Sequence, residues 1–204
     1  MGMGEPLLNF DNVIEATKII KDQNAYGLSR KRITISTSGI VPNIKKLNKH
    51  VDVSLAISLH AANDDLRDKI VPINKKYPIK MLLSSCIDFL ADHDNKRHIT
   101  IEYILIKDIN DSHEDAKSLV SLLSTFPCKI NLIPFNKFEG SDYERPSNNR
   151  INNFKKYLIE KGFITTLRTT RGDSVAGACG QLVGDLSNTV KGKNLIKHRS
   201  INER

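Results

Sequence analysis

Apolar residues recur along this chain with two different periods, which predict alternating helices and strands from residue 10 onward. Between positions 112 and 123 they fall on one face of a helix, and Ser112 with Asp115 has the spacing of a capping box. Ser147 and Gly162 bound a second helix of the same kind. Earlier helices are expected at about residues 10 to 24, 63 to 70 and 78 to 92.

The most informative extended segment runs from Val51 to His60. Its two faces differ: one carries Val51, Val53, Leu55, Ile57 and Leu59, and the other Asp52, Ser54, Ala56, Ser58 and His60. A parallel strand between two helix layers should be apolar on both faces, so this asymmetry favours a barrel whose inner face lines a wet, ligand-sized cavity. Further strands are expected at about residues 32 to 37, 98 to 106, 128 to 134 and 163 to 168. Five strands are too few for a closed eight-stranded barrel. The expected fold class is therefore α/β, an incomplete TIM-like barrel of parallel strands with crossover helices.

Composition narrows the class of protein. A chain of 204 residues with 39% hydrophobic content can bury a sizeable core as one domain. No apolar run reaches the length of about 18 residues that crosses a bilayer, and the first residues do not resemble a signal peptide, so we expect a cytoplasmic location without a membrane partner. The net charge of +8 would attract a polyanion. Many basic proteins bind none, so charge alone leaves nucleic-acid binding open.

The three cysteines are too far apart for a disulfide framework or a clustered metal site. Cys86 and Cys128 lie in apolar segments and are expected to be small core residues. Cys179 differs because Gly177 and Gly180 surround it and Arg171 is near in sequence. It is either an accessible thiol that favours the thiolate form or an inert loop residue.

Polar residues at the predicted strand ends are the candidate ligand contacts, because open α/β folds bind ligands there. The turn from Gly2 to Pro6 offers amides and a carboxylate to an amino-acid moiety, and the hydroxyls from Ser36 to Ser38 suit a ribose or a helix cap. His60 could be a base, a ligand contact or a solvated residue, and Asn136 could bind an adenine edge or loop backbone.

Taken together, these segments resemble the RlmN/Cfr family of radical S-adenosylmethionine RNA methyltransferases over about residues 1 to 186. The series is far more specific than any one of its members. The segments that carry the resemblance are Gly2-Met3-Gly4-Glu5-Pro6-Leu7, Ile35-Ser36-Thr37-Ser38-Gly39, Ser58-Leu59-His60-Ala61, Asp65-Leu66-Arg67, Val71-Pro72-Ile73-Asn74, Asn131-Leu132-Ile133-Pro134-Phe135-Asn136, Arg171-Gly172-Asp173 and Ala178-Cys179-Gly180-Gln181-Leu182.

The resemblance implies a radical-SAM barrel, S-adenosylmethionine and a [4Fe–4S] cluster as cofactors, and methylation of adenine carbon 2 in 23S rRNA and tRNA. Carbon 8 is the alternative target. It further implies an electron donor as partner, a monomeric enzyme, and Cys179 as the catalytic, methyl-carrying residue. The residues that the resemblance assigns to S-adenosylmethionine are Gly4, Glu5, Ser36, Ser58, Leu59, His60 and Asn136.

One departure from the family pattern is large: the sequence contains no Cys-x-x-x-Cys-x-x-Cys, so it offers no ligands for the cluster. A fragment, a misplaced start codon and a decayed gene all fit this departure. The alternative function is a non-catalytic RNA-binding or S-adenosylmethionine-binding remnant. We expect one partial barrel over residues 1–186, with the cysteine loop near its end, and a basic, flexible tail over residues 187–204.

Overall fold

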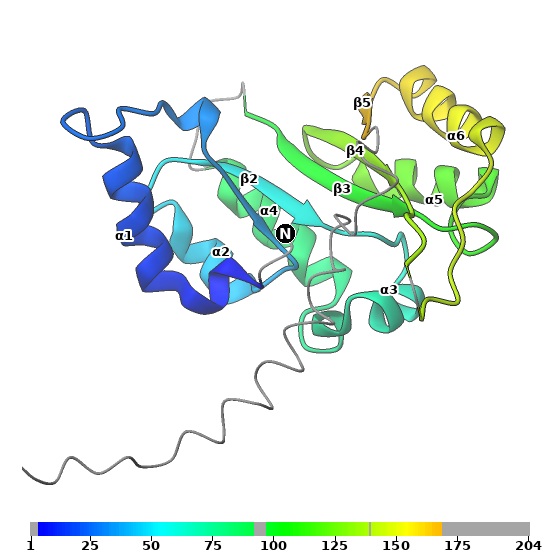
Figure 1. The fold of residues 1–204 in the computed structure, drawn as a ribbon, viewed down its shortest axis with the longest axis horizontal. Helices are drawn as coiled ribbons and strands as arrows, with labels where there is room; N and C mark the ends of the chain where they lie inside the picture. The colour runs from blue at the N-terminus through cyan, green and yellow to red at the C-terminus, as the bar shows by residue number, and fades with distance from the viewer. Residues whose placement is uncertain (1–3, 92–96, 139, 169–204) are drawn as a thin grey trace, which may run out of the picture. The chain divides into compact units, whose positions relative to one another are not determined.

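The computed structural model describes residues 4–91, 97–138 and 140–168 (Figure 1). The Cys179 loop and the tail over residues 187–204 lie outside the described residues. The helices are α1 (Phe10–Lys21), α2 (Val41–Leu47), α3 (Asp64–Ile70), α4 (Ile79–Ala91), α5 (His113–Leu123) and α6 (Asn148–Glu160), with 3-10 turns η1 (Pro6–Asn9), η2 (Arg30–Arg32) and η3 (Pro72–Lys75). The strands are β1 (Thr34–Thr37), β2 (Ser54–Ser58), β3 (Ile99–Leu105), β4 (Cys128–Pro134) and β5 (Ile164–Leu167).

The five strands form one parallel sheet in the order β1-β2-β3-β4-β5. Each strand pairs with the next along the chain, and at least one helix lies between them in sequence, as the alternating periods predicted. The longest register joins β3 to β4, from the pair Ile99 and Cys128 to the pair Leu105 and Pro134. The expected α/β class with an incomplete parallel barrel is confirmed.

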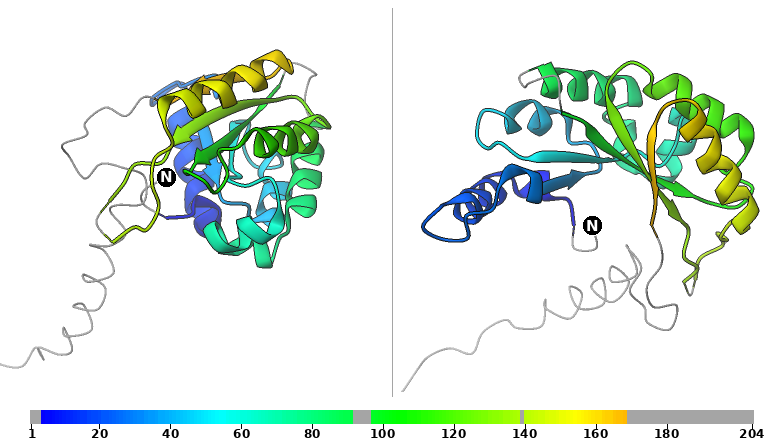
Figure 2. Two further views of the ribbon diagram at one scale, coloured as in Figure 1. Left: turned by 90° about the vertical axis from the view of Figure 1, so that its right-hand side faces the viewer. Right: turned by 90° about the horizontal axis from the view of Figure 1, so that it is seen from above.

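One face of the sheet is apolar and packs against helices, and the other is largely polar. Figure 2 shows α4, α5 and α6 along the same side of the sheet, and α2 packs against α4. The buried strand residues beneath these helices are Ile35, Leu55, Ile57, Ile99, Ile101, Tyr103, Ile130 and Leu132. Each such side chain contributes about 1.5–3 kcal/mol when it leaves water. The faces of β2 therefore differ as its sequence indicated.

Most helix boundaries follow from local signals. Ser112 and Asp115 form the expected capping box of α5, and the Ser147 hydroxyl accepts from the backbone N–H of Arg150 at the start of α6. Gly162, after α6, has the positive φ of 88° that glycine tolerates best. The strand expected from Val51 to His60 is shorter, because only Ser54–Ser58 pair with a neighbouring strand: Ser54–Ile57 with β1 and Ala56–Ser58 with β3.

Two expectations about buried cysteines are confirmed. Cys86 is fully buried on α4, and Cys128 is buried at the start of β4. Burial raises the pKa of each thiol to about 12, so both stay protonated at neutral pH. They therefore pack as small apolar groups.

Candidate functional site

The carboxyl ends of the strands bring several of the candidate residues to one edge of the sheet. Ser36 lies near the end of β1, Ser58 ends β2, and Asn136 follows β4 by two residues. Parallel strands all end at the same edge, so these positions share it. This edge is where ligands bind in open α/β folds.

Glu102 of β3 joins two of these residues. Its Oε2 atom lies 3.4 Å from the hydroxyl oxygen of Ser36 and 3.4 Å from that of Ser58. The strand register explains the arrangement, because Ser58 pairs with Glu102 and Ser36 pairs with Ala56 on the same face. Asn131 of β4 continues the row beside Glu102. The polar face thus presents a carboxylate between two hydroxyls.

His60 lies two residues after the end of β2 and has an unusual backbone conformation, with φ of 61°. Its Nδ1 atom accepts from the backbone N–H of Ile104 at 3.2 Å, so the neutral ring carries its proton on Nε2. Burial and the nearby Arg67 charge lower the pKa of His60 to about 4. At neutral pH the imidazole is therefore a hydrogen-bond donor through Nε2 and not a cation.

Arg67 is fully buried and forms hydrogen bonds to the ends of both β1 and β2. Its Nε donates to the carbonyl of Leu59 at 3.0 Å, and its Nη2 donates to the carbonyls of Ser38 at 2.7 Å and Ser58 at 3.1 Å. Its Nη1 donates to Oδ1 of Asn74 at 2.8 Å. Burial lowers the pKa of Arg67 to about 10 against the opposing effect of nearby carboxylates, so it stays charged at neutral pH.

Glu5 ties the segment before η1 to the end of β1. Its carboxylate accepts from the Thr37 hydroxyl at 2.8 Å, from the backbone N–H and hydroxyl of Ser38, both at 2.7 Å, and from the backbone N–H of Leu7 at 3.0 Å. A carboxylate has about four acceptor positions, so these contacts fill them. A ligand near this segment would therefore meet its backbone groups before the Glu5 carboxylate. The Ser36–Ser38 hydroxyls do not cap α2, which has no side-chain cap.

The remaining candidates differ in how far the structure describes them. Asn136 is half-buried, and no hydrogen bond among the described residues involves its side chain, so its amide is available to a ligand. Leu59 is fully buried and could offer only backbone groups, but its carbonyl accepts from Arg67 and its backbone N–H donates to the carbonyl of Glu102 at 3.1 Å. Gly4 is exposed with φ of 115°. Cys179 lies outside the described residues.

Sequence reasoning missed two residues that shape this edge. Glu102 was hidden because every second residue of β3 faces away from the helices, and only the register with β2 shows that it meets Ser58. Asn110 is fully buried in the loop after β3, where its Nδ2 donates to the carbonyls of His60 at 3.0 Å and Ile104 at 2.8 Å. The only hint in the sequence was an amide in a loop directly after a strand.

An iron–sulfur cluster does not fit the described residues of this chain. Among residues 4–91, 97–138 and 140–168, no group of three or more His, Cys, Asp or Glu side chains could hold a metal ion. Cys86 and Cys128 are buried thiols whose raised pKa disfavours the thiolate that a cluster needs.

Among the described residues, no helix has the length and apolar character to span a bilayer.

Comparisons with known proteins agree on one family. The model of the radical SAM superfamily matches residues 1–120. A protein named dual-specificity RNA methyltransferase RlmN from Pseudomonas putida (strain W619) is 59% identical over 191 residues, which cover 94% of this chain and 50% of that protein. One of the same name from Pseudomonas fluorescens (strain SBW25) is 56% identical over 203 residues, 99% of this chain and 53% of that protein. The chain thus spans about half the length of the curated relatives it matches.

Solved structures support the same fold. A radical SAM methyltransferase from Sphaerobacter thermophilus superimposes with a TM-score of 0.83 at 41% identity, covering 89% of this chain and 53% of that one. A domain of pyruvate-formate lyase-activating enzyme from Bacteroides vulgatus ATCC 8482 gives a TM-score of 0.62 at 19% identity, covering 81% of this chain and 95% of that one. The second likeness shows the fold alone.

Proposed function

This chain belongs to the radical SAM superfamily, and we propose that it is the S-adenosylmethionine-binding part of an RNA methyltransferase. The proposed reaction methylates carbon 2 of an adenine in 23S rRNA and tRNA. The observation that carries the proposal is the row of Ser36, Glu102 and Ser58 beside a neutral His60 at the ligand-binding edge of the sheet. The relatives named dual-specificity RNA methyltransferase supply the RNA substrate class.

The side chains at this edge suit the parts of S-adenosylmethionine. The hydroxyls of Ser36 and Ser58 match ribose hydroxyls, and the amide of Asn136 can both donate to and accept from an adenine edge. The Nε2–H of His60 adds a neutral donor. Gly4 and Glu5 stay the predicted contacts of the amino-acid moiety.

Several parts of the proposal concern the whole protein. The described residues do not hold a cluster, and we propose no cluster ligand within them. Cys179 is the proposed methyl carrier. A cytoplasmic location, a monomeric state and an electron donor remain predictions.

Binding of S-adenosylmethionine to the folded 204-residue chain tests the proposed site directly. Titration calorimetry should give a measurable Kd, which Asn136→Ala raises about three- to tenfold, the effect of one lost neutral hydrogen bond. Asn152→Ala is the matched control, because Asn152 is exposed on α6. A folded chain that binds no S-adenosylmethionine, or equal Kd values for the two variants, would contradict the site.

The reaction itself is tested in the organism that carries the gene. Deletion of the coding sequence should remove 2-methyladenosine from 23S rRNA, measured by mass spectrometry of digested nucleosides. Reintroduction of the gene should restore the modification. Unchanged 2-methyladenosine after the deletion would refute the proposed reaction and leave S-adenosylmethionine binding as a separate question.

A further inference from the structure

The carboxylate of Glu102 has acceptor capacity that the described residues do not use. Its Oε2 atom has the two contacts described above, with the hydroxyls of Ser36 and Ser58 at 3.4 Å each. These contacts are long, because O–H···O hydrogen bonds usually measure about 2.7–2.8 Å. No hydrogen bond or ion pair among the described residues involves its Oε1 atom. A carboxylate offers about four acceptor positions, so at least two remain for a ligand.

Glu5, which binds the end of β1, shows the contrast. It accepts four hydrogen bonds of 2.7–3.0 Å from the chain itself, so it serves to tie two segments together. Glu102 is half-buried and is not filled in this way. A ligand that covers it removes water from a charged group, and burying a charge is costly unless other donors replace the water. We therefore expect the ligand that binds here to bring hydrogen-bond donors of its own.

The fold holds Glu102 in the middle of the candidate site. Its backbone carbonyl accepts from the N–H groups of Leu59 at 3.1 Å and His60 at 3.2 Å, which continues the pairing of β2 with β3 past Ser58. Its side chain reaches the hydroxyl of Ser36 on β1, two strands away, and therefore extends across β2. A strand thus presents this carboxylate, and contacts built on strands are positioned more precisely than contacts on loops.

The donors and acceptors of this cluster suit the hydroxyls of a ribose. Ser36 has one hydroxyl proton, and when it donates that proton to Glu102 it offers only lone pairs to a ligand. Both groups then act as acceptors, and the vicinal hydroxyls of a ribose are two adjacent donors. Dinucleotide-binding α/β folds use a carboxylate for a ribose 2′-hydroxyl in the same way.

We propose that Glu102 binds the ribose hydroxyls of S-adenosylmethionine and makes the site specific for the ribonucleoside over its deoxy forms. This inference rests on the proposed function for its ligand, and it adds a contact that the family resemblance does not assign. Hydrogen bonds to a carboxylate are roughly twice as strong as those between neutral groups. The loss of one bound hydroxyl should therefore raise the Kd about tenfold or more.

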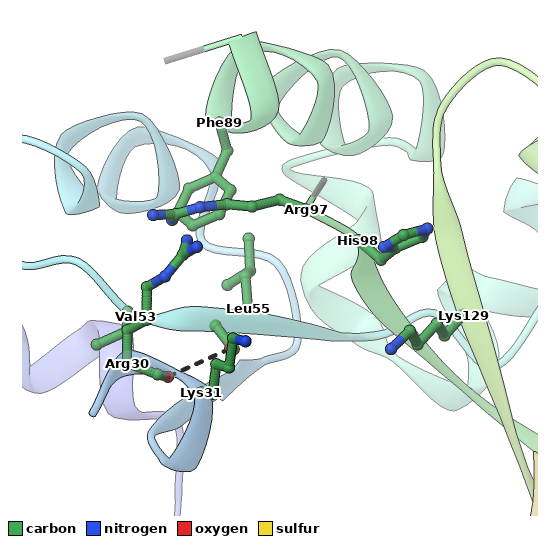
Figure 3. A pocket seen from close by; sticks show the side chains of 9 residues that line it. Arg30, Lys31, Val53, Leu55, Phe89, Arg97, His98 and Lys129 are labelled. Atoms are coloured by element: carbon green, nitrogen blue, oxygen red, sulfur yellow. Dashed lines mark hydrogen bonds between the residues drawn. The ribbon is translucent and has the colours of Figure 1, made fainter. Parts of the chain in front are cut away.

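A pocket of about 390 Å³ at the amino ends of the strands is a competing place for a nucleoside (Figure 3). Lys31 of η2, before β1, and Lys129, the second residue of β4, are among the side chains that line it. The candidate ligand contacts belong to the carboxyl ends of the same parallel strands, so the two places lie toward opposite edges of the sheet. Lys31→Gln therefore changes this pocket and leaves the contacts of Glu102 in place.

Titration calorimetry with the 204-residue chain tests the proposal, with S-adenosylmethionine and its 2′-deoxy and 3′-deoxy analogues as ligands. The parent chain should bind at least one analogue about tenfold or more weakly than S-adenosylmethionine. This comparison changes only the ligand, so it does not depend on how a variant folds. Equal Kd values for the three ligands on the parent chain would overturn the proposal.

Glu102→Gln keeps the size of the side chain and removes its charge. It should weaken binding of S-adenosylmethionine about tenfold and bring the three Kd values within about threefold of one another. Glu160→Gln, at the exposed end of α6, is the matched control and should keep the parent values. Circular dichroism confirms that each variant is folded.

Two other outcomes count against a ribose contact from Glu102. If Glu102→Gln weakens the binding of all three ligands by the same factor, the carboxylate contacts another part of the ligand, such as its α-ammonium group. If Lys31→Gln weakens S-adenosylmethionine binding and Glu102→Gln does not, the nucleoside lies in the pocket of Figure 3.

The ribose contact and the proposed function fail in different ways. A parent chain that binds S-adenosylmethionine and its deoxy analogues equally keeps the proposed methyl-donor site and loses only the contact from Glu102. A parent chain that binds none of the three ligands refutes the proposed site itself, and the ribose contact with it.

Discussion

Replacing Arg67 by lysine should both destabilise the fold and weaken S-adenosylmethionine binding. The guanidinium donates four hydrogen bonds, to the carbonyls of Ser38, Ser58 and Leu59 and to Oδ1 of Asn74. Three of these acceptors belong to the strand ends that carry the candidate ligand contacts. Lysine keeps the charge but has a compact ammonium that cannot reproduce the planar fork of donors.

The size of the effect follows from the acceptors left without a donor. A buried acceptor that loses its hydrogen bond costs about 1–3 kcal/mol, and breaking a buried charged network costs about 3–5 kcal/mol in total. Lysine recovers part of this through its own donors, so we expect a loss of about 3 kcal/mol in the free energy of unfolding. With a urea m-value of about 2 kcal/mol/M, the midpoint should fall by about 1.5 M.

Urea unfolding followed by circular dichroism measures the loss, and calorimetry at a temperature where both proteins are folded measures the Kd. Arg145→Lys is the matched control, because Arg145 is exposed, and its unfolding free energy should change by less than about 0.5 kcal/mol. If Arg67→Lys unfolds within about 0.5 kcal/mol of the parent, the network does not hold the strand ends. Equal Kd values would show that it does not position the ligand contacts.

Three further outcomes are expected. The pKa of His60 falls from 6.5 unfolded to about 4 folded, so its contribution to stability, on the order of 3 kcal/mol, is complete above pH 6.5 and is lost as pH falls toward 4. His60→Asn should flatten that part of the stability curve in urea unfolding, and an unchanged curve would refute the assignment. Cys86 and Cys128 should resist a thiol reagent at pH 8 until urea is added, because burial raises the pKa of both thiols to about 12. Fast labelling of either cysteine in the native protein would contradict their burial. Glu5→Gln should lower the free energy of unfolding by about 2 kcal/mol, because an amide cannot accept all of the carboxylate's hydrogen bonds. The control Glu15→Gln, at an exposed position, should change the free energy of unfolding little. Equal urea midpoints for the two variants would argue against a stabilising role of the Glu5 carboxylate.

The sequence predicted every strand of the described sheet, because alternating apolar residues and strand-end turns are local signals. It missed α2, because this helix is only seven residues long, has just three apolar core residues (Val41, Ile44 and Leu47) and contains Pro42. It also extended β2 to His60, although the backbone turns there into a positive φ that the Asn110 side chain supports through the His60 carbonyl. Neither feature leaves a periodic trace.

The candidate site was predictable as a set of residues but not as a geometry. Ser36, Ser58 and Asn136 stand out because each lies at a predicted strand end. The role of Glu102 depends on which residue of β2 it faces, and that register follows from packing between segments far apart in sequence. The contacts with S-adenosylmethionine stay a prediction until binding is measured.

The pairing of each strand with its successor also has a consequence for folding. Every hydrogen-bonded strand contact joins neighbours along the chain, so each adjacent pair closes only the single crossover between its strands. Folding rates rise as contacts become more local, because a shorter closed loop loses less chain entropy. The sheet can therefore grow from the long β3 and β4 pair by adding one strand and its crossover at a time. Cutting the chain outside a pair of adjacent strands and their crossover removes none of the contacts within that pair.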